Sequence, residues 1–291
     1  MSSPRVWIDG ARPRTLVAAI VPVLLGIAVA PGGIAVLDII VRGGLAAVVS
    51  LALQVAVNYA NDYSDGVRGT DAQRVGPRRL VASGAASPRA VKVAATIAGG
   101  VAVVAGGVLA FLTTPWLILV GAASLVAAWG YTGGSRPYGY RGLGEVFVFV
   151  FFGLVATVGT TYVVAEVVAF RSLIVGSIAG LLAVALLVVN NLRDRVTDEA
   201  VDKRTLAVRL GDRGTRALYV GCFVAVFALV TTIALGRPMV LITLIGAIPA
   251  VRASARVLRG ASGRDLIVVL GLTARAQLVV GVLLALTTWT W

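Results

Sequence analysis

Histidine is absent from this sequence of 291 residues, and cysteine occurs once, as Cys222. Without histidine there is no imidazole to bind a metal or to act as a general acid or base. A single cysteine excludes disulfide bonds within the chain. Charged residues are also scarce, at 13%, whereas hydrophobic residues make up 58% and the mean hydropathy is +0.94. A soluble domain of this length would not bury so much apolar surface, so the sequence predicts that its solvent is a lipid bilayer.

Apolar segments recur along the whole chain, and a helix needs roughly 20 such residues to cross the hydrocarbon layer. We expect nine spans, near 14–31, 36–61, 88–111, 115–131, 144–165, 172–193, 215–236, 238–258 and 268–290. The apolar runs are continuous and do not alternate, which argues against a transmembrane β-barrel. No linker or change of composition divides the chain. The predicted fold is an all-α polytopic membrane protein with one domain, residues 1–291, and nine transmembrane helices.

Basic residues are distributed unevenly between the two predicted sides of the membrane. The net charge of +13 alone is compatible with nucleic-acid binding. However, 22 of the 26 basic residues lie in the N-terminal segment and in the loops after every second span, and the other side holds only Arg42, Arg171 and Arg237. This bias indicates a cytoplasmic N-terminus and no nucleic-acid partner. Because 11 of the 13 acidic residues share the basic side, we expect it to do more than anchor anionic lipid.

Two acidic clusters follow the second and sixth predicted spans, "NYANDYSDGVRGTD" and "NNLRDRVTDEAVDKRT". Each places an amide and two carboxylates on one helical face. The residues are Asn58, Asp62 and Asp65 in the first cluster, and Asn190, Asp194 and Asp198, with Asp202 as a candidate fourth, in the second. Stacked carboxylates repel one another, and here they lie at helix C-termini, where the macrodipole is already negative. A bound divalent cation would remove both penalties.

Oxygen ligands of this kind suit a hard ion, so the sequence predicts Mg²⁺. Mg²⁺ usually binds one or two carboxylates and bridges to substrate phosphates, which implies a phosphorylated ligand. Neighbouring basic residues would bind the remaining phosphate oxygens. They are Arg68, Arg74, Arg78 and Arg79 after the first cluster, and Arg195, Lys203, Arg204 and Arg209 after the second. Ordinary interfacial ion pairs are the alternative, which we prefer for Arg195.

A ligand that combines a diphosphate with an apolar chain suits a site at this depth, and prenyl diphosphates have that form. Mg²⁺ and basic side chains would stabilise the departing pyrophosphate. The allylic fragment left behind is cationic and needs a dry, electron-rich pocket. Aromatic residues are available near the right level, namely Tyr63, Tyr131, Tyr138, Tyr140, Phe147 and Phe149.

The two clusters resemble the aspartate-rich motifs of the UbiA-type intramembrane prenyltransferases. "NDYSDGVRGTD" is similar to the first motif, and "NNLRDRVTDEAVDKRT", with its D-xxx-D core, is similar to the second. Three further stretches, "ARPRTL", "YTGGSRPYGYRGLGE" and "KRTLAVRLG", resemble the branch that prenylates 1,4-dihydroxy-2-naphthoate in menaquinone synthesis. The resemblance implies nine transmembrane helices around a central cavity.

The resemblance also implies roles for individual residues. One Mg²⁺ would be held by Asp62 and Asp65 with Asn58 or Asn61, and another by Asp194 and Asp198 with Asn190 or Asn191. The diphosphate would contact Arg68, Lys203 and Arg136, and Gln54 would point into the cavity. As a hypothesis, the acceptor carboxylate pairs with Arg12, Arg136 or Arg141, while Glu145 orients a phenol.

The preferred function is transfer of a polyprenyl group from polyprenyl diphosphate to 1,4-dihydroxy-2-naphthoate, at the cytoplasmic side of the cell membrane. The product would be demethylmenaquinone, with CO₂ and pyrophosphate released. This electron-rich ring can attack an allylic cation without a strong base, which fits the lack of histidine. The alternative acceptors are 4-hydroxybenzoate, haem or a sugar phosphate. A divalent-cation secondary transporter is less favoured because transport sites lie near the membrane midplane, and a structural anchor leaves both acidic faces unexplained.

Overall fold

The computed structural model describes residues 4–70 and 79–289, and over these residues it is all-helical with no strand, which confirms the all-α part of the predicted fold. The elements are α1 (Pro4–Ala11), α2 (Pro13–Ala28), α3 (Val36–Arg68), α4 (Pro88–Leu112), α5 (Trp116–Gly130), the 3₁₀ helix η1 (Tyr138–Arg141), α6 (Gly144–Val148), the π-helix η2 (Phe149–Val155), α7 (Ala156–Ala165), α8 (Phe170–Ala200), α9 (Leu206–Gly236), the 3₁₀ helix η3 (Pro238–Gly246), α10 (Ala247–Leu258) and α11 (Asp265–Thr288).

Several of these helices can span a bilayer, so the chain is a multi-pass membrane protein. Among the described residues, seven helices or continuous helical runs are long and apolar enough, and α1 with α2, bent by 52°, can supply an eighth. The bend lies at Arg12, whose φ of 54° is left-handed. The apolar helix α5 has only 15 residues, fewer than the roughly 20 that a span takes. The count of nine spans therefore stays a prediction.

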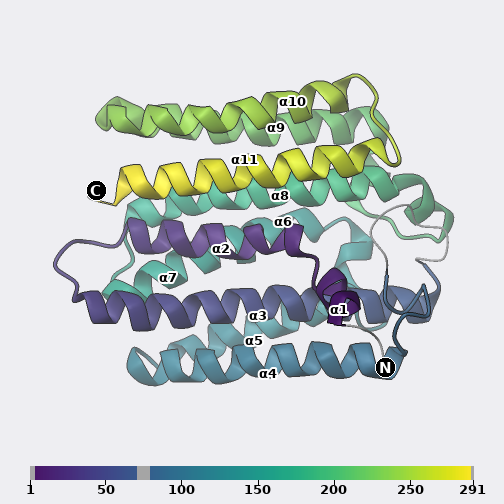
Figure 1. Ribbon diagram of the computed structural model, residues 1–291, viewed down its shortest axis with the longest axis horizontal. Coiled ribbons are helices and arrows are strands. Elements are labelled where there is room, and N and C mark those ends of the chain that lie inside the picture. The colour runs from purple at the N-terminus through teal and green to yellow at the C-terminus, as the bar shows by residue number, and fades with distance from the viewer. Residues whose placement is uncertain (1–3, 71–78, 290–291) are drawn as a thin grey trace.

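Helix α8 lies at the centre of the bundle. It packs against α9, η2, α2 and α11, and Figure 1 shows the long helices lying side by side along the longest axis of the molecule. The most apolar stretch of α8 has a mean hydropathy of 2.7, the highest of the spans, and 72% of that stretch is buried, against 17% to 50% in the others. A helix that is apolar on every side is expected to be buried in this way.

Glycine lets the π-helix η2 approach α8 closely. A Cβ atom on Gly153 would lie 2.5 Å from the Cα atom of Gly180 and 2.7 Å from the carbonyl oxygen of Gly176. Small residues allow such close backbone contact between membrane helices. A π-turn within an α-helical span often marks a functional site, and η2 lies directly beside the cavity described below.

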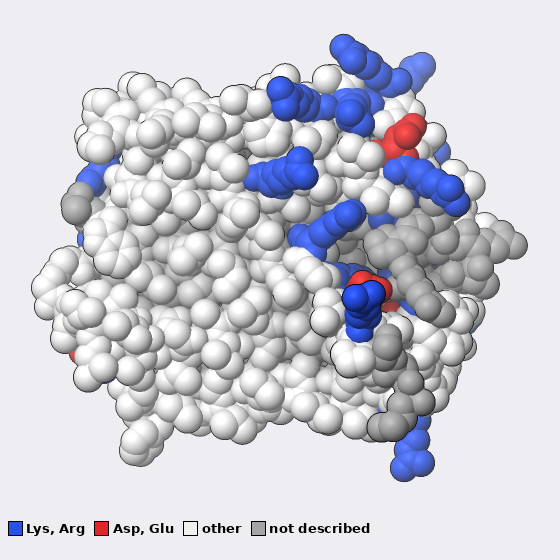
Figure 2. All heavy atoms as spheres, viewed as in Figure 1, with Lys and Arg blue, Asp and Glu red and all other residues white. Residues whose placement is uncertain are grey.

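The outer surface of the bundle is apolar along its length and basic at one end. Large side chains such as Phe111 on α4 and Leu235 on α9 are 90% and 87% exposed, as expected for surfaces that face lipid. Figure 2 shows that Lys and Arg side chains gather at the end of the bundle that carries α1. The C-terminal ends of α3 and α8 lie at this same end, and they carry the two acidic clusters.

Candidate active site

The last turns of α3 form the first wall of the site. Gln54, Asn58, Asn61 and Asp65 are buried, share one helical face and line one cavity. The helix ends at Gly69, whose left-handed φ of 74° lets its N–H bond back to the last turn. This stop leaves Asp65 in the final turns of α3, at the basic end of the bundle.

Helix α8 supplies the second wall. Asn190, Asp194 and Asp198, spaced i, i+4, i+8, all line the cavity, and Asn191 joins them. This is the face that the sequence predicts for the second cluster. Asp202, the candidate fourth acid, follows the end of α8 with a left-handed φ of 54° and does not line the cavity.

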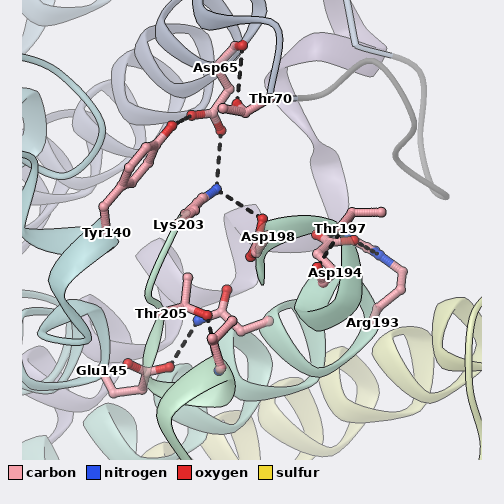
Figure 3. Close-up of polar contacts among 12 residues, drawn as sticks. Asp65, Thr70, Tyr140, Glu145, Arg193, Asp194, Thr197, Asp198, Lys203 and Thr205 are labelled. Atoms are coloured by element: carbon pink, nitrogen blue, oxygen red, sulfur yellow. Dashed lines mark hydrogen bonds and ion pairs between the residues drawn. The ribbon is translucent and has the colours of Figure 1, made fainter. Parts of the chain in front are cut away.

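Lys203 joins the two walls. Its Nζ atom lies 3.6 Å from Asp65 Oδ2 and 3.5 Å from Asp198 Oδ1, so one ammonium group serves an acid from each helix. Figure 3 shows the side chain reaching between the two carboxylates. Tyr140 completes the arrangement, because its hydroxyl donates to Asp65 Oδ1 at 2.7 Å and Lys203 lies over its ring at 5.0 Å from the centroid. The two acidic helix ends therefore face each other across one cavity, as the sequence predicts.

Beyond the polar walls, the cavity is lined by apolar side chains. Its volume is about 310 Å³, and it extends between α2, α3, α5, η2, α7 and α8. The apolar lining includes Leu53, Val120, Phe151, Phe152, Val155 and Leu187. Of the predicted aromatic residues, Tyr131, Tyr138 and Phe147 line the cavity, and Tyr138 stacks on Phe147 with ring centroids 3.9 Å apart. The site thus combines a charged end with an apolar interior.

Asp62 lies outside this lining, although the sequence predicts it as a metal ligand. It is fully buried, and its two oxygens accept the backbone N–H groups of Leu80 and Val81 at 2.8 and 2.9 Å. The face of α3 that lines the cavity contains Asn61 in its place. On the cavity face of α3, Asn61 therefore stands where the sequence predicts Asp62.

Two contacts around α8 were not predicted as pairs from the sequence. Asp194 accepts two hydrogen bonds from the adjacent Arg193, each 2.8 Å long, and both side chains are nearly buried. Asn191 donates its amide N–H to Glu145 Oε1 at 2.9 Å, and Glu145 itself does not line the cavity. This bond orients the Asn191 amide and leaves its carbonyl oxygen available to a ligand.

Three predicted arginines do not line the cavity, namely Arg136 and Arg141 in the loop between α5 and α6 and Arg68 on α3, which contacts that loop. Arg68 donates to the backbone carbonyl oxygens of Thr132 and Gly134 and so anchors this loop to α3. Arg136 and Arg141 are exposed. Their contacts with diphosphate or acceptor stay predictions. Two other basic residues from the sequence, Arg74 and Arg78, lie outside the described residues.

Sequence patterns gave no signal for several polar residues of the site. Thr132 donates its hydroxyl to Asn61 Oδ1 at 2.7 Å, and the Thr15 hydroxyl accepts from Asn58 Nδ2 at 3.1 Å. Arg79, by contrast, is predicted from the sequence as a phosphate-binding residue, and it lines the cavity with 8% of its surface exposed. A threonine in an apolar segment is usually interpreted as part of the helix, and only the tertiary structure shows which hydroxyls fix the site amides.

The phenol of Tyr140 stays protonated at ordinary pH. Burial, followed by the neighbouring Asp65 carboxylate, raises its pKa above the usual value, although Lys203 acts in the opposite direction. Since the neutral phenol is the form that donates to Asp65, this shift preserves the hydrogen bond. The neutral phenol therefore fixes the orientation of the Asp65 carboxylate through this bond.

The donor set of the cavity suits a hard cation shared with a ligand, and not a cage made of protein alone. Among the described residues, no three acidic side chains converge closely enough to hold a metal by themselves. The cavity acids instead belong to two facing helices, with carboxamide oxygens beside them. Mg²⁺ commonly binds one or two carboxylates and completes its shell with phosphate oxygens and water. The Lys203 ammonium already places positive charge between the two walls, within 3.6 Å of Asp65 and 3.5 Å of Asp198.

Removing the Tyr140 hydroxyl is expected to weaken the site without unfolding it. Tyr140→Phe keeps the ring beneath Lys203 but loses the hydrogen bond that orients Asp65. Loss of a group that orients a ligand typically costs roughly ten- to a hundredfold in metal affinity or activity. The measurement is the Mg²⁺ concentration that gives half-maximal turnover. Tyr219→Phe is the control, because that hydroxyl bonds Thr273 and the residue does not line the cavity, and an equal effect in both variants would contradict the role of Tyr140.

This combination of an all-helical membrane bundle and two facing acidic helix ends belongs to a known class. Residues 19–270 match the UbiA prenyltransferase family, so the chain is a member of it. It is 50% identical over 281 residues to 1,4-dihydroxy-2-naphthoate octaprenyltransferase from Mycobacterium tuberculosis, covering 96% of this chain and 95% of the relative. The enzyme of the same name from Escherichia coli is 35% identical over 229 residues, covering 74% of this chain and 72% of that one.

Solved structures show the same fold at low sequence identity. A UbiA homologue from Aeropyrum pernix K1, solved in its apo form, matches with a TM-score of 0.70 and 16% identity over 94% of this chain and 97% of that one. A UbiA homologue from Archaeoglobus fulgidus, solved with DMAPP and Mg²⁺, matches with a TM-score of 0.59 and 12% identity over 96% of this chain and 98% of that one.

Proposed function

We propose that this chain transfers a polyprenyl group from polyprenyl diphosphate to 1,4-dihydroxy-2-naphthoate and releases pyrophosphate and CO₂. The observation that carries the proposal is the pair of acidic helix ends, joined by Lys203, at the charged end of an apolar cavity. One end suits a diphosphate and the other suits an isoprenoid chain. The relatives named 1,4-dihydroxy-2-naphthoate octaprenyltransferase, which align over most of this chain, support the choice of acceptor.

The metal would be Mg²⁺, held by the carboxylates that line the cavity. These are Asp65 on α3 and Asp194 and Asp198 on α8, with Asn61, Asn190 and Asn191 beside them. When bound, Mg²⁺ supplies charge that stabilises the pyrophosphate leaving group. The Archaeoglobus homologue solved with DMAPP and Mg²⁺ supports a divalent metal in this family. Asp62 is left out of this ligand set because it does not line the cavity and its two oxygens accept the backbone N–H groups of Leu80 and Val81.

Residues of this chain bind the two ends of the donor and keep water away from the reaction. Lys203 and Arg79 bring positive charge to the polar end, where they would bind diphosphate oxygens. The prenyl chain would lie among the apolar side chains between η2, α5 and α8. As the prenyl C–O bond breaks, pyrophosphate leaves with the bonding electrons, and Tyr131, Tyr138 and Phe147 present aromatic rings to the allylic cation.

Arg12 is proposed to bind the carboxylate of the acceptor. Of the three arginines predicted for this role, it is the one that lines the cavity, and its Nη2 atom donates to the backbone oxygen of Asn58 at 3.4 Å. The acceptor ring carbon that bears the carboxylate forms the new bond to the prenyl carbon. Loss of CO₂ then returns its electron pair to the ring, which gives the quinol form of demethylmenaquinone.

The basic end of the bundle is proposed to face the cytoplasm, with the protein in the cell membrane. Lysine and arginine are enriched in cytoplasmic loops of membrane proteins, and they gather here at the end that carries the site. A divalent-cation transporter is not favoured, because the acids lie at the C-terminal ends of α3 and α8 and not near their centres.

Acceptor dependence is the sharpest test of the proposed function. Purified protein in proteoliposomes would be given polyprenyl diphosphate and Mg²⁺ with 1,4-dihydroxy-2-naphthoate, with 4-hydroxybenzoate, or with no acceptor. We expect pyrophosphate, CO₂ and a prenylated naphthalene product in the first case alone. Equal transfer to 4-hydroxybenzoate would move the proposal to another acceptor, and pyrophosphate release that needs no acceptor would reject it.

A further inference from the structure

Asp62 is an acid of the first motif that the proposed reaction does not use. It is on α3 beside Asn61, yet its side chain points away from the cavity lining and is fully buried. Each carboxylate oxygen accepts a different backbone N–H, from Leu80 at 2.8 Å and from Val81 at 2.9 Å. A buried carboxylate is costly unless it is hydrogen-bonded. This pair of bonds therefore holds the backbone of Leu80 and Val81 against α3.

Gly66, one turn after Asp62, makes this approach possible. A Cβ atom at position 66 would lie 2.5 Å from the Cβ atom of Val81, so only glycine leaves room for the segment. On the other side, Leu80 is fully buried between Tyr59 and the α1 helix, where a Cβ atom on Gly10 would lie 2.6 Å from Leu80 Cδ1. Asp62, Gly66 and the packing of Leu80 against Tyr59 and α1 together fix the backbone at residues 80 and 81.

Arg79 immediately precedes this fixed segment. Its side chain is 8% exposed and lines the same cavity as Asp65 and Lys203. An arginine binds phosphate best when its planar guanidinium is held in place beforehand, because less conformational freedom is lost on binding. The backbone next to Arg79 is therefore held by Asp62 and Gly66, neither of which lines the cavity.

We propose that Asp62 and Gly66 form a positioning clamp that holds Arg79 at the cavity as a binding group for the diphosphate of the donor. This inference rests on the proposed function, which already gives Arg79 to the diphosphate, and adds the two residues that position it. In this proposal Asp62 positions the guanidinium group of Arg79 and does not bind the metal ion.

Two binding measurements on the purified, full-length protein separate these roles. The first is the Kd for a prenyl diphosphate at saturating Mg²⁺, measured by calorimetry. The second is the Kd for Mn²⁺ alone, measured from the electron paramagnetic resonance signal of the free ion. We expect Asp62→Asn, Gly66→Ala and Arg79→Gln each to raise the Kd for prenyl diphosphate by roughly ten- to a hundredfold, the range typical of outer-shell partners. The Kd for Mn²⁺ should stay within about twofold of wild type, since the metal-facing acids remain.

Gly66→Ala keeps every carboxylate of the motif and is therefore the decisive variant. Its control is Gly44→Ala on the same helix, where an added Cβ atom meets nothing within 4 Å. If Asp62 acts through Arg79, Asp62→Asn combined with Arg79→Gln should bind prenyl diphosphate no more weakly than Arg79→Gln alone. Should Asp62→Asn fail to fold, the comparison of Gly66→Ala with Gly44→Ala still decides the question.

Three results would overturn the clamp. The first is a tenfold loss of Mn²⁺ affinity in Asp62→Asn, which would make Asp62 a metal ligand. The second is unchanged binding of prenyl diphosphate in Gly66→Ala, and the third is unchanged binding in Arg79→Gln. Failure of the proposed function is distinct, because the wild-type protein itself would then not bind a prenyl diphosphate.

Discussion

Asp65→Asn is expected to lower prenyl transfer by on the order of a thousandfold while the bundle stays folded. Asp65 is 2% exposed, lines the cavity, and has one oxygen bonded to Tyr140 and the other facing Lys203. An amide has the same shape but lacks the charge that a metal and a lysine both require. The measurement is kcat/KM for the donor at saturating acceptor and Mg²⁺, beside a thermal unfolding curve in the same detergent.

A second Asp→Asn exchange provides the control for that result. Asp212 on α9 pairs with Arg216 four residues later and does not line the cavity. We expect Asp212→Asn to keep its activity to within a few fold, because exposed ion pairs on helices typically contribute about 0.5 kcal/mol. If Asp65→Asn were as active as Asp212→Asn, the assignment of the metal site to this cavity would be wrong.

Removal of divalent cations is expected to have a comparable effect and to be reversible. A chelator should stop turnover, with a loss of at least about a thousandfold, because metal ions contribute several kcal/mol to such displacements. The fold should persist, since Lys203 already lies between Asp65 and Asp198 and offsets their charge. The measurement is turnover before chelation, after chelation and after Mg²⁺ is restored.

The control for chelation is the same chelator saturated beforehand with Mg²⁺, which should leave turnover unchanged. Undiminished activity after exhaustive chelation and dialysis would contradict the metal requirement. A fall in the unfolding midpoint that parallels the loss of activity would show instead that the metal holds the bundle together.

The architecture was largely predictable because its physical causes are local in the sequence. Continuous apolar runs indicate spans, and α8 follows from an uninterrupted stretch that is apolar on every side. The face of α8 that lines the cavity was also predicted, because Asn190, Asp194 and Asp198 share one helical stripe. Where helical periodicity allowed one solution, the structure agrees with it.

Two faces of α3 fit the spacing of the first cluster. The face with Asp62 was predicted from the sequence, whereas the cavity is lined by the face with Asn61. Spacing alone lets Asp62 or Asn61 share a face with Asn58 and Asp65. The choice depends on the segment at residues 80 and 81, which bonds to Asp62 and turns Asn61 toward the cavity. That contact joins positions 18 and 19 residues apart, so helical periodicity contains no record of it.

The positions of the loop arginines and the pairing of neighbouring residues could not be predicted either, because both depend on contacts that helical periodicity does not describe. The backbone of a loop decides where its side chains point, so Arg136 and Arg141 could not be placed before the loop was known. Arg193 and Asp194 are adjacent on α8, and adjacent residues do not face each other in an ideal helix. Their two hydrogen bonds depend on how the long arginine side chain folds back.

The central position of α8 also limits how far its sequence can drift. Between residues 175 and 195 no residue of this helix is exposed, so each side chain there meets packed neighbours or the cavity. On α4 and α5, by contrast, many side chains are exposed on the outer surface of the bundle, where they need only remain hydrophobic. Random mutagenesis should therefore find few tolerated changes between residues 175 and 195, and many between residues 97 and 126.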